Sequence, residues 1–114
     1  MAIDPAQPLP SRPATPVVFF ERRELNQLLG LYGRMVAAGH WRDYAIDALK
    51  DAAVFSIFRH TGDTPLYRIE KRPASARRQG AWVVLAHGGL VLRRGHELTQ
   101  VLRFFDRARF TVVD

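Results

Sequence analysis

The chain has 114 residues, of which 47% are hydrophobic and 25% are charged, and it contains no cysteine. This composition is typical of one globular domain, and it excludes disulfides, thiolate nucleophiles and cysteine-ligated metal sites. No apolar run approaches the roughly 18 residues that a membrane span needs, and no secretory signal pattern opens the chain. We therefore expect a cytoplasmic protein that has no membrane partner.

The positive charge is concentrated in one part of the sequence. The formal net charge is +6 at pH 7, and residues 68–94 carry an excess of that same size, with a single acid, Glu70, among seven basic side chains. Those seven are Arg68, Lys71, Arg72, Arg77, Arg78, Arg93 and Arg94. A neutral body that carries one cationic segment indicates an anionic partner.

The N-terminal part divides into a leader and the start of a domain. Residues 1–16 contain five of the seven prolines and little to bury, which predicts a disordered leader before a single domain over 17–114. The apolar run Val17–Phe20 is predicted to be a first strand. A helix is then expected over about 21–38, because apolar residues recur at helical spacing, and Gly39 is placed to end it. The apolar positions are Leu25, Leu28, Leu29, Tyr32, Met35 and Val36.

The next two segments are predicted to be strands. Residues 44–50 alternate weakly as a strand, with a helix capped by Asp43 as the alternative. Residues 53–60 are apolar on both faces, with Phe55 and Phe58 pointing in opposite directions. This pattern predicts a central strand that is covered on both sides.

The remainder of the chain predicts a hairpin and a second helix. Residues 66–71 and 81–87 alternate as strands, and Gly88-Gly89 predicts a tight turn into a strand over 90–93. A helix is expected over about 96–107, with Phe110–Val113 as an edge strand. The predicted fold class is therefore α+β, an antiparallel meander of about four to six short strands between an N-terminal-side and a C-terminal helix.

The connection over 72–80 is the candidate binding segment. It reads RPASARRQG, is long for a hairpin loop, and carries three arginines without an acid. One interpretation is a mobile basic tip that grips phosphate, and the other is a solvated loop without a ligand. If Lys71 pairs with Ala81, Arg68 and Trp82 share a face, and Trp82 becomes a candidate aromatic for base stacking. The alternative, which we favour, is that Trp82 packs under the first helix.

No pattern in the sequence indicates catalysis, a cofactor or a metal. The four histidines, His40, His60, His87 and His96, lack the spacing of metal-ligand pairs, and structural or surface roles are expected for them. The Gly88-Gly89 pair is not followed by the lysine and helix of a phosphate-binding loop. We therefore expect no catalytic residue, no metal site and no cofactor.

Several strings resemble one bacterial family. They are RRELN at 22–26, LYGRMVAAGHWRDYAIDALKD at 31–51, VFSIFR at 54–59, PLYRIEK at 65–71, ARRQG at 76–80 and LRRGHEL at 92–98. Together they resemble, over roughly 20–110, the α-proteobacterial family called domain of unknown function 2794. The resemblance implies a small standalone bacterial protein without a known catalytic site, and it transfers no functional residue. Glu21 stands where the family pattern leads us to expect aspartate, which is a better helix cap.

The sequence thus favours a non-enzymatic protein that binds an anionic partner through an arginine-rich hairpin. Nucleic acid is the first hypothesis for the partner. The alternative is an interaction or assembly module that docks on an acidic protein surface, and a small enzyme of unrecognised type is third. The oligomeric state is not predicted.

Overall fold

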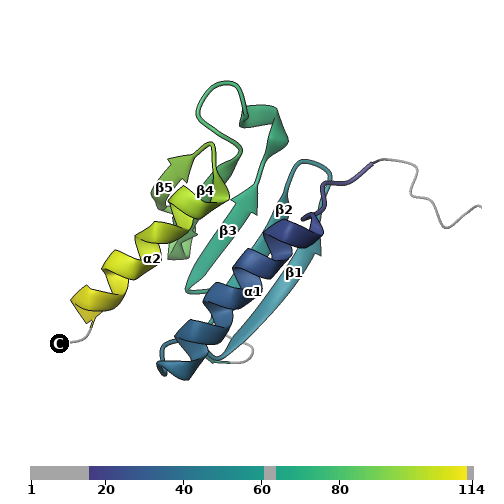
Figure 1. Cartoon of the computed structure of the whole chain (residues 1–114). Helices are drawn as coiled ribbons and strands as arrows, with labels where there is room; N and C mark the ends of the chain where they lie inside the picture. Colours follow the sequence, from purple (N-terminus) through teal and green to yellow (C-terminus); the bar gives the residue numbers. More distant parts are fainter. Residues whose placement is uncertain (1–15, 61–63, 113–114) are drawn as a thin grey trace, which may run out of the picture.

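The computed structural model describes residues 16–60 and 64–112, and beyond Asp106 it describes the backbone alone (Figure 1). One helix precedes and one helix follows five consecutive strands, which confirms the predicted α+β class. The elements are α1 (Arg22–Ala37), β1 (Asp43–Ala48), β2 (Ala53–Phe58), β3 (Tyr67–Lys71), β4 (Trp82–Ala86), β5 (Val91–Gly95) and α2 (Leu98–Val112), with 3-10 turns η2 (Pro73–Ser75) and η3 (His87–Gly89). The predicted leader lies, apart from Pro16, outside the described residues.

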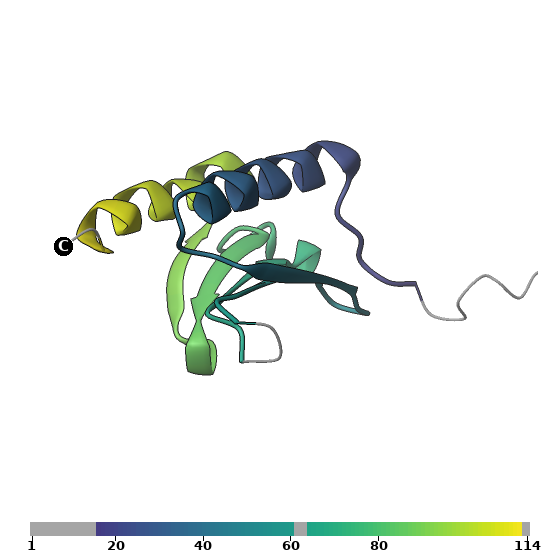
Figure 2. The same ribbon diagram turned by 90° about the horizontal axis from the view of Figure 1, so that it is seen from below.

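The five strands form one antiparallel sheet in chain order, β1-β2-β3-β4-β5. Each strand therefore pairs with its sequence neighbour through a short connection, as in a meander. The ambiguous segment after Trp41 is strand β1, and the helical alternative is wrong. Both helices lie side by side on one face of the sheet and run in the same direction (Figures 1 and 2). The opposite face, called the open face below, has no helix of the described chain over it (Figure 2).

The core lies between the helices and the covered face of the sheet. The spacing of apolar residues explains how the helices contribute to this core. Residues three or four positions apart lie on the same side of a helix, and the apolar side of each helix packs against the strands. The buried core residues are Leu28, Leu31 and Met35 from α1, Leu98, Val101 and Phe105 from α2, and Trp41, Phe55, Ile57, Ile69, Trp82 and Val84. Val36, which the predicted stripe included, is instead exposed.

Several local predictions differ from the structure. Val17–Phe20 is not a strand, since its Val18 N–H makes one bond to Leu49 O at 2.8 Å and no ladder follows. Phe110–Val113 is not an edge strand, because α2 continues to Val112. Phe55 is fully buried on the covered face, whereas Phe58 at the strand end is only half-buried. The predicted central strand is β2, which is an inner strand next to the β1 edge and is covered by helices on one side only, whereas β3 is the middle strand.

The start of α1 is fixed despite the glutamate in the capping position. The Oε1 atom of Glu24 accepts a hydrogen bond of 2.8 Å from the backbone N–H of Glu21. This is the reciprocal half of a capping box, and it satisfies a donor that the first helical turn leaves free. The helix therefore begins at Arg22.

Candidate anion-binding surface

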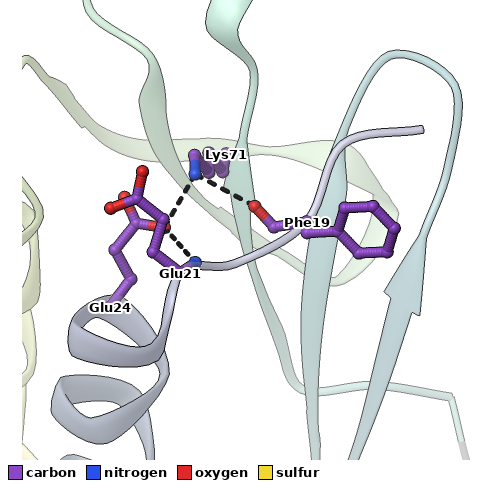
Figure 3. Close-up of polar contacts among 4 residues, drawn as sticks. All are labelled: Phe19, Glu21, Glu24 and Lys71. Carbon is purple, nitrogen blue, oxygen red and sulfur yellow. Dashed lines mark hydrogen bonds and ion pairs between the residues drawn. The ribbon is translucent and has the colours of Figure 1, made fainter. Parts of the chain in front are cut away.

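Lys71 is a structural residue rather than a free cation. Its side chain points to the helix-covered side, where Nζ donates to Glu24 Oε1 at 2.7 Å and to Phe19 O at 3.0 Å (Figure 3). The side chains of Lys71 and Glu24 are only 15% and 20% exposed. Lys71 thus ties the end of β3 to the segment before α1 and to the first turn of that helix.

Two arginines of β3 and its end share one acid on the open face. Arg68, Glu70 and Arg72 alternate with the core residues of the strand, so they point to the other side. Glu70 is 4% exposed, and its carboxylate accepts from Arg72 Nε at 2.7 Å and lies 3.5 Å from Arg68 Nε. The two arginine side chains are 44% and 41% exposed. Sequence reasoning did not assign this role to Glu70, although the Arg-x-Glu-x-Arg alternation was visible.

The connection over 72–80 is folded into a compact turn. Arg72 N–H donates to Ala81 O at 2.6 Å, and Ser75 O accepts from the N–H groups of Arg78, Gln79 and Gly80 at 3.0–3.2 Å. Gly80 closes the turn with a φ of +96°, and a Cβ there would stand 2.1 Å from Gly95 O. Only glycine fits this position. This segment, interpreted above either as a mobile basic tip or as a solvated loop, is therefore a loop whose backbone is held at both ends.

The remaining cations at this hairpin divide by exposure. Arg77 and Arg78 are exposed in the loop, and Arg94 is exposed opposite Val83 on the open face. Within the described part of the chain, none of these three makes an ion pair. Arg93 stands opposite Val84, on the covered side, and is half-buried. The seven predicted residues therefore do not form one surface.

The predicted register of Trp82 is wrong by one residue. Lys71 pairs with Trp82, and Arg68 pairs with Leu85, so Trp82 and Arg68 point to opposite faces. Trp82 is 5% exposed and stacks on Phe20, with ring centroids 6.1 Å apart. The ring is in the core, as the favoured alternative held, and is not open to a base.

One row of paired residues crosses the open face from an acidic to a basic position. The register aligns Asp47, Val54, Glu70, Val83 and Arg94 from β1 to β5. The row thus has aspartate on the β1 edge, glutamate on β3 and arginine on the β5 edge. The arginines of β3, of the loop after it and of the open face of β5 are Arg68, Arg72, Arg77, Arg78 and Arg94, called the hairpin arginines below. Glu70 neutralises one of these five charges, which leaves an excess of four.

Across residues 16–60 and 64–112, no three histidine, aspartate or glutamate side chains gather as metal ligands would. No helix in those ranges has the length and apolarity to cross a membrane. His87 precedes the paired glycines of the β4–β5 turn, which adopt φ values of +80° and +85° as predicted.

Comparisons with known proteins identify a family and nothing finer. Searches of curated proteins and of solved structures each found no significant match. A family model matches residues 18–102, which include α1, the whole sheet and the start of α2. The chain belongs to the family described as protein of unknown function (DUF2794).

Proposed function

We propose that this protein is a non-enzymatic, cytoplasmic binding protein whose hairpin arginines contact nucleic acid. The contacts are made to the phosphate backbone, because guanidinium groups are planar, permanently charged and donate two parallel hydrogen bonds to phosphate. Binding of this kind depends on salt and little on sequence.

The main support for the proposal is the solvent exposure of Arg77 and Arg78 in the β3–β4 loop. Both are exposed, adjacent and without an ion pair among the described residues, on a loop whose backbone is fixed by the bonds to Ser75 O. Holding the loop in one shape lowers the entropy that binding must remove. Arg72 and Arg94 extend the same charge from the loop onto the open face.

Fluorescence anisotropy with labelled RNA and labelled duplex DNA tests this proposal. The wild-type protein is titrated between about 50 and 200 mM salt, where counterion release is most visible. We expect Arg77→Ala/Arg78→Ala to weaken binding to every sequence similarly and to reduce the log–log salt slope on duplex DNA by about 1.8.

A matched control is the double substitution Arg34→Ala/Arg103→Ala. It removes the same charge from exposed positions on the two helices, outside the hairpin, and we expect it to change the slope little. Absence of salt-sensitive binding by the wild-type protein would contradict the nucleic-acid proposal. Pull-down from lysate with the wild-type protein and the Arg77/Arg78 double variant would then test docking on an acidic protein instead.

A further inference from the structure

A second group of cationic side chains lies at the end of the molecule opposite the hairpin loop. A hollow of about 470 Å³ opens there, where α1 ends, β1 begins and β2 ends. In Figure 1 this is the lower end of α1, away from the β3–β4 connection. Its volume falls within the range of about 300–1,000 Å³ that is common for small-molecule sites. Its lining includes His40, Trp41, Arg42, Arg59 and His60.

The backbone beneath these side chains is held at several points. After α1, Gly39 takes a φ of +84° and His40 N–H donates to Met35 O at 2.9 Å. Arg42 N–H donates to Phe58 O at 2.9 Å, and Arg42 O accepts from the Tyr32 hydroxyl at 2.8 Å. The base of the Arg42 side chain is therefore fixed on both sides, as a preorganised binding residue requires.

The packing of Trp41 fixes the next position. Trp41 is 5% exposed, and its ring meets that of Phe105 edge-on with centroids 5.2 Å apart. It lines the hollow with an apolar surface while it remains part of the core. The hollow thus combines an anchored aromatic wall with cationic and imidazole side chains.

Among the described residues, the two arginines share the hollow without an acid in its lining. Arg42 N–H donates to Phe58 O, the residue before Arg59, so the two arginines stand at neighbouring ends of β1 and β2. Two cations that line one hollow repel each other. In the described ranges, neither guanidinium makes an ion pair, and no acidic side chain lines the hollow. A bound anion would replace this repulsion by attraction.

We propose that this hollow, called the end pocket below, binds a small phosphate-bearing molecule. Phosphate offers the oxygens that two guanidinium groups can hold in bidentate fashion, and the imidazoles of His40 and His60 supply further N–H donors. The apolar wall of Trp41 and Val36 leaves room for an organic group attached to the phosphate. This site is independent of the hairpin and of the nucleic-acid proposal.

The two tryptophans allow a direct test by NMR. Trp41 lines the end pocket, whereas Trp82 lies in the core against Phe20. The full chain is titrated with inorganic phosphate and with phenyl phosphate, in a buffer that contains no other phosphate. We expect a saturable shift of the assigned Trp41 indole N–H signal, stronger with phenyl phosphate, and no shift of the Trp82 signal.

Substitutions then locate the site. Arg42→Ala and Arg59→Ala are each expected to weaken binding at least about tenfold, since each removes a charge-assisted bidentate contact. Arg59→Lys keeps the positive charge but loses the planar guanidinium that makes two parallel bonds, so it should weaken binding less than the alanine substitution does. If an alanine variant does not fold, this lysine variant tests whether Arg59 contacts the phosphate. Arg77→Ala/Arg78→Ala should leave the titration unchanged. A Trp41 signal that does not move at millimolar phosphate, or binding that only the Arg77/Arg78 variant abolishes, would overturn the proposal.

Discussion

The two faces of the sheet bury their residues in different ways. On the covered face, apolar side chains from both helices and four strands interlock, and the cation Lys71 beside them is matched by Glu24. On the open face, Val54, Ser56, Glu70, Val83 and Leu85 are buried although no described helix lies over them. Arg94 stands opposite Val83 on this face, and the apolar stem of a long charged side chain can cover its neighbours while the head stays in water.

This difference shows how one charged stretch of sequence is divided between the two faces of the sheet. Successive residues of β3 point to opposite faces, so Lys71 joins the covered side while Glu70 and Arg72 join the open side. The concentration of charge in the sequence therefore overstates the proposed binding surface. Part of the charge stabilises the fold, and the exposed loop carries the part that we propose binds nucleic acid.

The largest expected effect is on the covered face. Phe55→Ala should lower the free energy of unfolding by about 3–5 kcal/mol, because Phe55 is fully buried between β1, β3 and the helices. Urea denaturation measures the change. A loss below about 1 kcal/mol would show that the helices do not pack on this face as described.

Two adjacent valines of β4 compare the faces directly. Val84 is 0% exposed on the covered face, and Val83 is 2% exposed on the open face. We expect Val84→Ala to cost about 2–3 kcal/mol, since a cavity is left between rigid layers. Val83→Ala should cost about 1 kcal/mol, because the arginine stems above it can settle into the space. Equal costs in urea denaturation would mean that the open face is packed as tightly as the covered one.

Removing the acid from the open face tests its charge arrangement. Glu70→Gln should lower the free energy of unfolding by about 1–2 kcal/mol, because it leaves Arg68 and Arg72 without their shared carboxylate. The expected loss is kept small because both arginines are partly exposed to solvent, which weakens the ion pairs. Asp47→Asn is the matched control in the same cross-strand row, and its exposed side chain should change stability by less than about 0.5 kcal/mol. Similar losses from both substitutions in denaturant unfolding would contradict the pairing described here.

The smallest effect concerns pH. Burial, with a smaller contribution from the charge of Asp43, raises the pKa of Tyr32 above its ordinary value of 10.0. The folded state therefore holds this proton where the unfolded state releases it, so stability falls as the pH rises above about 10. Tyr32→Phe removes the hydrogen bond to Arg42 O, so it should lower the free energy of unfolding by about 1 kcal/mol at neutral pH. The stability of this variant should also decline less steeply as the pH rises into the alkaline range. Thermal unfolding of both proteins between pH 8 and about 11 measures the difference, and parallel curves would exclude this role for Tyr32.

Much of the fold follows from local patterns in the sequence. The apolar spacing of residues 98–105 predicts α2, and the alternation of residues 67–71 predicts β3 with its two faces. The paired glycines at 88 and 89 predict the turn that their positive φ values form. These signals depend only on neighbours along the chain.

The errors arise where distant parts of the chain decide the outcome. Phe20 is apolar because it stacks on Trp82 and not because it lies in a strand. The one-residue register error followed from pairing Lys71 with Ala81, where the structure pairs Arg72 with that residue through a bond of 2.6 Å. Phe110 and Val112 favour a strand by propensity, yet α2 runs through them as a continuing helix. The end pocket is lined by Arg42 and Arg59 from the ends of two different strands, a juxtaposition that no local pattern reveals.

The most direct test of the central claim compares two single substitutions that each remove one positive charge from the hairpin. Lys71→Met removes a charge that Glu24 already neutralises, and Arg78→Ala removes a free one. We expect Arg78→Ala to reduce the log–log salt slope of duplex DNA binding by about 0.9 and Lys71→Met to leave it unchanged. An equal reduction by both substitutions would contradict the division of this charge between folding and binding.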